Sequence, residues 1–328
     1  MPLEDSDTTV AAILATMNRP EYVRDAIASV CEQTHESMEV VVIDDSDDGK
    51  TKAVVDELRR TYSDVPFIYL HNDTPQGLPA ARNQGSEATD ARFLAFLDDD
   101  DRWYPEKTSR QLSLFRAALD DLALVHSGYV GRHEDGSHKM TVTPDYEHPA
   151  YPSILKENFI GTPSTVMVER DAFEAAGGFD ETIRFCEDWD LYIRIAREYR
   201  FAYVSDPLIE RTYHADAMTE DLEPFFKYRK RLLEKYEDQL LRHDVSDRAW
   251  TIHYRLLGRK HLEAGNRSRA RDAYRTAWSV TNEVDFAVMC VLLYVLPISF
   301  ARPTMQTIGE ARARVDRRLE RGFRSSSA

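Results

Sequence analysis

The chain has 328 residues, 42% of them hydrophobic and 30% charged, so it is long enough to bury the core of one large or two smaller domains. Its 42 Lys and Arg against 57 Asp and Glu give a formal net charge of −15, which argues against a nucleic-acid partner. Three widely spaced cysteines without a CxxC motif exclude a disulfide scaffold, argue against structural zinc and fit a reducing compartment, and we expect no signal peptide.

The first half of the chain alternates short apolar runs with amphipathic stretches, which predicts strand-helix units feeding a mainly parallel sheet. Strands are predicted at residues 10–15, 38–43, 67–70 and 92–97, and helices at residues 21–31, 51–62, from 77 onward and 106–119. Ligand sites of open α/β sheets lie beyond the carboxyl ends of the strands. The residues at those ends are Thr16, Asn18, Arg19, Asp44, Asp45 and Asp98 to Asp101.

Four consecutive aspartates, Asp98 to Asp101, follow the strand at 92–97. They cannot all lie exposed and ionised in one turn without repulsion, and a divalent cation is the simplest partner that relieves it. Carboxylate oxygens suit Mg²⁺ or Mn²⁺, with substrate phosphates as further ligands. The alternative is an acidic turn that caps the following helix.

A second acidic segment, Glu187-Asp188-Trp189-Asp190, begins an amphipathic helix. A helix dipole lowers the pKa of carboxylates in the first turn, so we expect a base at this position to be ionised at neutral pH. A plain N-terminal cap is the alternative.

Five segments together carry a family resemblance. They are Ala15-Thr16-Met17-Asn18-Arg19-Pro20, Val42-Ile43-Asp44-Asp45-Ser46, Gly77-Leu78-Pro79-Ala80-Ala81-Arg82-Asn83-Gln84-Gly85, Phe96-Leu97-Asp98-Asp99-Asp100-Asp101-Arg102-Trp103-Tyr104-Pro105 and Glu187-Asp188-Trp189-Asp190-Leu191. Their order and spacing resemble those of family 2 glycosyltransferases over about the first two thirds of the chain. The resemblance implies an α/β GT-A fold with a Rossmann-like mixed sheet, a nucleotide-diphosphate sugar donor, Mg²⁺ or Mn²⁺, and inversion at the anomeric carbon.

The resemblance also implies roles for individual residues. Donor binding falls to Thr16, Asn18, Arg19, Asp45, Arg82 and Asp98, with Asp45 facing the base and Arg82 touching the nucleotide. The metal ligands are expected among Asp98, Asp100, Asp101 and His214, the choice along the aspartate run being open by one position and His214 being equally compatible with a surface histidine. Asp188 matches the catalytic base. Met17 departs from the pattern, since an aromatic residue is common there, which leaves base stacking in doubt.

The last third of the sequence reads as helical. A boundary near residue 220 separates a catalytic domain, 1–220, from a helical extension, 221–285, in which residues 254–278 resemble one tetratricopeptide-like hairpin. Residues 286–301 carry no charge and precede a tail with seven Arg against three acidic residues, a local sum of +4. Sixteen residues are short for a membrane span, so 286–328 is predicted as an interfacial anchor, with a buried helix or re-entrant segment as alternatives.

The sequence therefore predicts a metal-assisted inverting glycosyltransferase that transfers a hexosyl or related sugar to a hydroxyl of a glycan or lipid-linked acceptor. We expect it to be cytoplasmic, peripheral at the membrane face, and to serve glycan biosynthesis or protein glycosylation. Two alternatives remain at this point: an inactive module that binds nucleotide sugars or glycans, and a nucleotidyltransferase.

Overall fold

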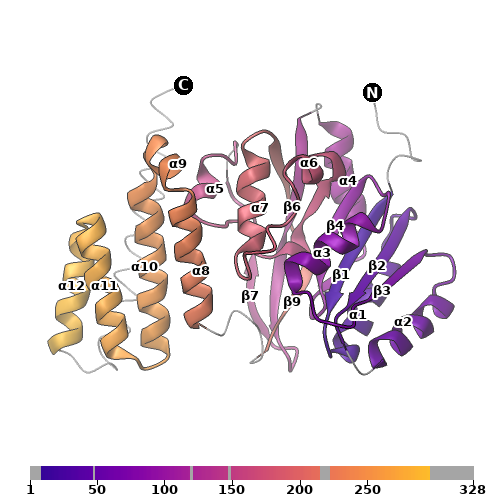
Figure 1. The fold of residues 1–328 in the computed structure, drawn as a ribbon, viewed down its shortest axis with the longest axis horizontal. Helices are drawn as coiled ribbons and strands as arrows, with labels where there is room; N and C mark the ends of the chain where they lie inside the picture. The colour runs from indigo at the N-terminus through magenta and orange to yellow at the C-terminus, as the bar shows by residue number, and fades with distance from the viewer. Residues whose placement is uncertain (1–8, 47–48, 119–120, 147–148, 215–221, 296–328) are drawn as a thin grey trace. The chain divides into compact units, whose positions relative to one another are not determined.

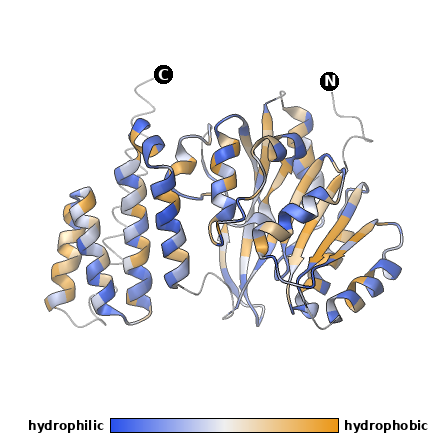
Figure 2. Cartoon of the chain, in the orientation of Figure 1, coloured by the Kyte–Doolittle hydropathy of each residue, from blue (hydrophilic) through white to orange (hydrophobic). Residues whose placement is uncertain are grey.

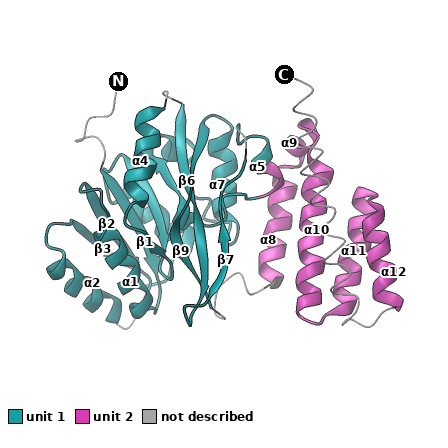
Figure 3. Cartoon of the chain, turned by 180° about the vertical axis from the view of Figure 1, so that it is seen from behind, with its two compact units in different colours: residues 1–154, 158–221 teal, residues 155–157, 222–328 magenta. Residues whose placement is uncertain are grey.

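A computed structural model describes residues 9–46, 49–118, 121–146, 149–214 and 222–295. Contacts divide the chain into two compact units, residues 1–154 with 158–221, and residues 155–157 with 222–328 (Figure 3). The first unit holds a mixed sheet flanked by helices, and the second is helical (Figure 1). The predicted strand and helix alternation of the first half is confirmed.

The sheet of the first unit has nine strands among the described residues, in the order β3-β2-β1-β4-β8-β6-β9-β5, with β7 paired to β6. These strands are β1 (Val10–Thr16), β2 (Met38–Asp44), β3 (Phe67–His71), β4 (Phe93–Asp98), β5 (Arg102–Trp103), β6 (Leu122–His133), β7 (His138–Val142), β8 (Met167–Glu169) and β9 (Arg200–Tyr213). The first four are mutually parallel where they pair, and β8 joins antiparallel to β4 and β6. The sheet is therefore mixed, as the resemblance implied.

The helices of the first unit are α1 (Pro20–Cys31), α2 (Lys50–Thr61), α3 (Leu78–Glu87), α4 (Lys107–Ala117), α5 (Ser153–Lys156), α6 (Arg170–Ala175) and α7 (Glu187–Ala196), with the last two residues of α5 assigned to the second unit. A 3₁₀ turn, η2, spans Pro163–Thr165. Strands β1, β2 and β4 are almost wholly buried, which explains their uninterrupted apolar sequences, coloured orange in Figure 2.

Helix α3 packs against β1 and β2 at a glycine. A Cβ at Gly85 would lie 2.5 Å from Ile43 Cδ1 and 2.7 Å from Ile13 Cγ2, closer than van der Waals contact permits. The missing side chain therefore sets how near α3 comes to the strands. This spacing matters for the site because Arg82 lies on the same helix, one turn before Gly85.

The second unit contains α8 (Leu222–Lys235), α9 (Glu237–Arg242), α10 (Ser246–Glu263), α11 (Arg267–Thr281) and α12 (Val284–Val295). Helices α10 and α11 form the two arms of a hairpin, and Gly258 allows the ring of Tyr274 to lie directly against α10. Helix α12 adds Phe286, Met289 and Leu293 to the same core. The predicted boundary at residue 286 thus falls inside α12, and the tail 296–328 lies outside the described residues.

Candidate active site

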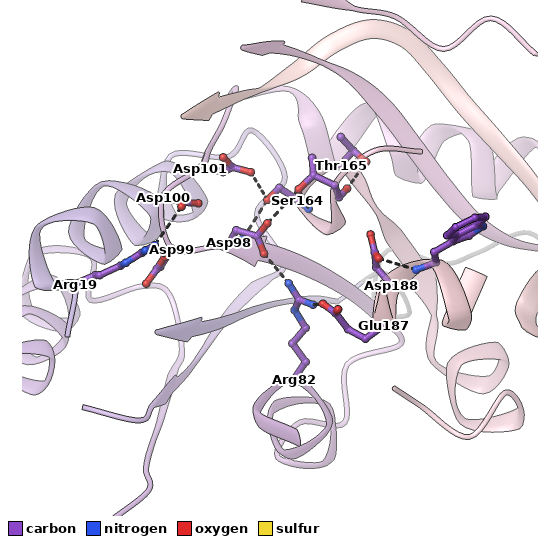
Figure 4. A network of polar contacts seen from close by, with 12 residues as sticks. Arg19, Arg82, Asp98, Asp99, Asp100, Asp101, Ser164, Thr165, Glu187 and Asp188 are labelled. Atoms are coloured by element: carbon purple, nitrogen blue, oxygen red, sulfur yellow. Dashed lines mark hydrogen bonds and ion pairs between the residues drawn. The ribbon is translucent and has the colours of Figure 1, made fainter. Parts of the chain in front are cut away.

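The carboxyl ends of β1, β2 and β4 bring the first set of predicted residues to one edge of the sheet. In the parallel register Thr16 pairs with Asp44, and Ala15 pairs with Asp98, so residues beyond those positions converge. Figure 4 shows Arg19 and the four aspartates grouped at this edge, with Arg82 between Asp98 and Glu187 and with Asp188 beside Glu187 at the start of α7.

The four aspartates have different partners although they are consecutive. Asp98 accepts hydrogen bonds from Arg82 Nη2 at 2.7 Å and Thr162 Oγ1 at 3.1 Å. Asp100 contacts His214 Nε2 at 2.7 Å and Arg19 Nη1 at 3.2 Å. Cationic side chains therefore offset much of the repulsion that the sequence alone suggested.

Asp99 and Asp101 are buried and held by hydroxyl groups. Asp99 accepts from Thr16 Oγ1 at 2.7 Å, and Asp101 accepts from Ser164 Oγ at 2.6 Å and from the Thr212 backbone N–H at 3.1 Å. Burial raises the pKa of Asp99 to about 6 and raises that of Asp101 well above its ordinary value. Asp99 therefore ties the turn after β4 to the end of β1, and Asp101 ties it to η2 and β9.

The donor set of this turn fits a hard divalent cation. Carboxylate oxygens of Asp98, Asp100 and Asp101 lie within 4.8 Å of one another, and those of Asp98 and Asp100 are partly exposed. His214 reaches Asp100 from the end of β9 and stacks on Tyr22, with ring centroids 5.6 Å apart. Oxygen ligands in this number, with room for further ligands from a substrate, suit Mg²⁺ or Mn²⁺.

Asp45 occupies a separate cradle after β2. Its Oδ1 accepts from Asn72 Nδ2 at 2.8 Å, and its Oδ2 accepts from the backbone N–H groups of Gln76 and Gly77 at 3.0 and 3.3 Å. These bonds fix the loop that leads into α3. Asn18, with φ of 58°, lies close in space, because its backbone N–H donates to Oγ of Ser46, the residue after Asp45, at 2.7 Å.

Arg82 joins the aspartate turn to the start of α7. It is 3% exposed, and its guanidinium donates to Asp98 Oδ1 and to Glu187 Oε1, both at 2.7 Å. The structure thus assigns its nitrogens to two carboxylates, a contact that the resemblance did not indicate. Because Arg82 bridges β4 and α7, it fixes the two acidic segments relative to each other.

Asp188 lies in the first turn of α7 and retains partial exposure. Its Oδ1 accepts from the Trp189 backbone N–H at 2.7 Å, and its Oδ2 accepts from Asn158 Nδ2 at 3.0 Å. The expectation that the helix dipole leaves this carboxyl readily ionised is wrong. Burial, followed by the charge of Glu187, raises the pKa of Asp188 to about 7, and this outweighs the helix N-terminus and Arg82.

Several site residues escaped sequence reasoning. Asn158, Thr162 and Ser164 come from the connection before β8 and touch Asp188, Asp98 and Asp101 respectively. No spacing pattern marks them, because polar residues in an irregular connection are ordinary turn formers. Gly161, with φ of 99°, and Pro163, which opens η2, are local signals that this connection has a fixed geometry.

A family model for glycosyl transferase family 2 matches residues 11–177, which covers β1 to α6 and the aspartate turn. The chain belongs to glycosyl transferase family 2. It is a glycosyltransferase, as the resemblance implied, and its first unit has the expected GT-A architecture.

This family 2 glycosyltransferase is similar in sequence to curated glycosyltransferases and similar in fold to solved ones. The putative teichuronic acid biosynthesis glycosyltransferase TuaG of Bacillus subtilis is 28% identical over 162 residues, 49% of this chain and 62% of TuaG. Residues 1–349 of S. aureus TarS in complex with UDP-GlcNAc superpose with a TM-score of 0.56, 16% identity and 92% coverage of each chain.

A second solved structure is similar in fold. The mannosyltransferase PcManGT of Pyrobaculum calidifontis, in complex with GDP-Man and Mn²⁺, matches with a TM-score of 0.53 and 16% identity, covering 93% of this chain and 80% of that one. In the described part of the family 2 glycosyltransferase chain, none of the helices has the length and hydropathy needed to cross a bilayer.

Proposed function

We propose that the chain is an inverting, metal-assisted glycosyltransferase that moves a sugar from a nucleotide diphosphate to a hydroxyl of a glycan or lipid-linked acceptor. One observation carries this most directly: Arg82 joins Asp98, in a turn suited to a divalent cation, to Glu187, the neighbour of the partly exposed Asp188. Arg82 thereby fixes the proposed metal site and the proposed base relative to each other.

The donor half of the proposal rests on the strand ends. Thr16, Asn18, Arg19 and Asp45 follow β1 and β2, where a nucleotide would lie along the carboxyl edge. TarS and PcManGT bind UDP-GlcNAc and GDP-Man respectively, and both share this fold. Arg19 lies beside Asp99 and Asp100, where its positive charge favours a diphosphate.

Asp98 and Asp100, with His214 and Asp101 as further candidates, would hold Mg²⁺ or Mn²⁺. The bound ion would stabilise the charge that develops on the departing nucleoside diphosphate, as a Lewis acid. Asp101 has the weaker claim, since Ser164 and Thr212 already engage its two oxygens. Arg82 holds Asp98 in place from the side opposite to Thr162, so its role is positioning rather than direct nucleotide contact.

Asp188 is the proposed general base. The acceptor O–H gives its proton to a carboxylate oxygen of Asp188 as the acceptor oxygen bonds to the anomeric carbon. The bond from that carbon to the diphosphate oxygen breaks on the opposite face, so configuration inverts. A pKa of about 7 matches this task, because the carboxylate is then a stronger base than an ordinary aspartate yet remains available near neutrality.

A donor panel tests the reaction class. UDP-GlcNAc, GDP-mannose and related donors are incubated with the full chain, with and without Mn²⁺ and with water as the acceptor, and the released nucleotide and the anomer of the sugar first released are identified. We expect nucleoside diphosphate release that depends on the metal, and an inverted anomer. Release of pyrophosphate would indicate a nucleotidyltransferase, and donor binding without turnover would indicate a binding module.

The acceptor class is proposed from the relatives and the C-terminal helices. TuaG is named as a putative glycosyltransferase of teichuronic acid biosynthesis, which supports a glycan or lipid-linked acceptor. Helix α12 exposes Val284, Val288, Val291 and Val295 along one face, while its other face is buried. Seven arginines follow in residues 302–328, a complement to anionic lipid head groups.

We therefore propose that the exposed face of α12 lies on an anionic bilayer surface. The helix of 12 residues is about 18 Å long, too short to cross a hydrocarbon core of about 30 Å. Membrane attachment at the cytoplasmic face would bring the enzyme to lipid-linked acceptors.

Vesicle flotation tests the membrane contact. The full chain is expected to float with phosphatidylglycerol vesicles at low salt and far less with phosphatidylcholine vesicles. Val288→Glu with Val291→Glu, and a chain ended after Val295, should each lose most of this binding. Leu241→Glu, at an exposed apolar position of α9, serves as a control that should float normally. Flotation of both test variants at the level of the full chain would refute the contact.

A further inference from the structure

The side chain of Asn158 makes three hydrogen bonds that together fix its orientation. Its Oδ1 accepts the backbone N–H groups of Ile160 at 3.1 Å and Gly161 at 3.2 Å. Because both of those groups are donors, the opposite end of the amide must be Nδ2, and it points at Asp188 Oδ2, 3.0 Å away. The amide therefore donates to the carboxylate.

The connection that carries Asn158 is tied to α7 at a second point. Trp189 Nε1 donates to the backbone oxygen of Ile154 at 2.6 Å, and the Trp189 backbone N–H donates to Asp188 Oδ1. Trp189 is 1% exposed. The carboxylate of Asp188 is thus held at one oxygen by its own helix and at the other by a side chain that comes from another segment.

We propose that Asn158 is a positioning residue for the reaction: its amide N–H fixes Asp188 Oδ2 so that the carboxylate faces the acceptor hydroxyl. The inference rests on the proposed role of Asp188 as base. Asn158 suits this role because it can hold the carboxylate through a hydrogen bond without bringing a charge of its own. A lysine or arginine at the same place would pair with Asp188 and weaken it as a base.

Charged and titratable groups from three elements interact with Asp188. Glu187 and Tyr192 come from α7, Arg82 from α3 and Asp98 from β4. Asn158 supplies a neutral donor on the remaining side. Replacing that donor by a second carboxylate would therefore act on Asp188 directly, and loss of the donor would leave Oδ2 without this bond.

Asn158→Asp is the sharpest variant, because its carboxylate still accepts from Ile160 and Gly161 while the donor to Asp188 is lost. With UDP-GlcNAc and GDP-mannose as donors, water as the acceptor and Mn²⁺ present, we expect kcat at pH 7 to fall by about 10- to 100-fold. The apparent pKa of the acid limb, in a plot of kcat against pH, should rise by about one unit or more. The donor KM should change by less than about twofold. An unmoved acid limb would overturn the inference.

Asn83→Asp is the matched control. Asn83 also accepts a backbone N–H, from Phe179 at 2.9 Å, and donates to a carboxylate, Glu181 Oε1, at 3.0 Å. The same chemical change is made there in the same unit, at a residue whose hydrogen bonds go to Phe179 and Glu181 rather than to Asp188. We expect the acid limb to stay where it is in the unaltered chain.

A double-mutant cycle of melting temperatures tests the Asn158–Asp188 contact separately from the proposed role of Asp188 as base. Melting temperatures are compared at pH 8 for Asn158→Asp, Asp188→Asn and the double variant, in which the donor and acceptor are exchanged. We expect the exchange to recover part of the loss caused by Asn158→Asp, since the new amide can donate to the new carboxylate. Additive changes would refute the contact, whereas full turnover by Asp188→Asn would refute the base and leave the contact standing.

Discussion

The aspartate turn after β4 and the acidic start of α7 use the same residue types for different chemistry. In the turn, Asp98 and Asp100 are partly exposed and face Arg82, Arg19 and His214. At α7, Asp188 lies where burial and Glu187 oppose its ionisation, and its pKa rises to about 7. One cluster is therefore suited to hold a cation, and the other to take a proton.

Arg82 is what the two clusters share, since one guanidinium serves Asp98 and Glu187. Two acidic segments about 90 residues apart in sequence are therefore coupled electrostatically through one guanidinium. Substitutions that affect only one cluster, or that remove Arg82, test this comparison most directly.

Asp188→Asn should have the largest effect. It removes the proton acceptor while keeping the shape of the side chain, so transfer should slow by about 10²- to 10⁴-fold. Binding of UDP or GDP with Mn²⁺, measured by calorimetry, should be unchanged, because the aspartate turn is intact. Transfer at near the original rate would show that the two clusters do not divide the work in this way.

Arg82→Gln should break the link between the clusters. Removing one partner of a buried ion pair leaves Glu187 and Asp98 uncompensated, which costs about 3–5 kcal/mol in the free energy of unfolding. Urea unfolding measures this loss. Arg92→Gln, which breaks an exposed pair with Glu169, is the control and should cost less than about 1 kcal/mol.

Asp100→Ala should affect the metal rather than the base. We expect the activity at a fixed Mn²⁺ concentration to drop by about 10²-fold, because an oxygen ligand and the partner of His214 are lost together. A titration with Mn²⁺ measures the shift, and Asp90→Ala, at an exposed position, is the control. If the Mn²⁺ titration is unchanged, Asp100 is not a metal ligand.

The pH dependence should be the mildest effect and runs in opposite directions for activity and stability. Below pH 7 the base is protonated, so kcat/KM should fall about tenfold per unit. The folded pKa lies above the unfolded value, so this group's contribution to stability is complete below about pH 4 and is lost as the pH rises through 7. Melting curves at pH 5 and 8 should therefore converge in Asp188→Asn.

The sequence could predict the strand ends and both acidic segments, because buried parallel strands are uninterrupted apolar runs and their ends are marked by Thr16, Asp44 and Asp98. It could not predict the pKa of Asp188. The helix-dipole argument is local, whereas the burial that decides the value comes from segments distant in sequence. Asn158 stayed hidden for the same reason, since its partner lies 30 residues away.

The helical unit shows a similar limit. The uncharged run from residue 286 was predicted as an interfacial anchor, with a buried helix as one alternative, and the structure shows one buried face, on which Phe286, Met289 and Leu293 pack into the core with α10 and α11. Average hydropathy does not distinguish the two faces of a helix that is apolar on both of them, as α12 is after Asp285. Which face is covered depends on the tertiary partner, and the structure supplies that information for α12.

Gly85 restricts the substitutions that the residues around this site can accept in evolution. Since α3 rests on Ile13 and Ile43 with no room for a methyl group, the volumes at these three positions are expected to covary among relatives. A larger residue at 85 would lift the helix and withdraw Arg82 from Asp98 and Glu187. Selection on catalysis is thus expected to act on the size of residues that never meet a substrate.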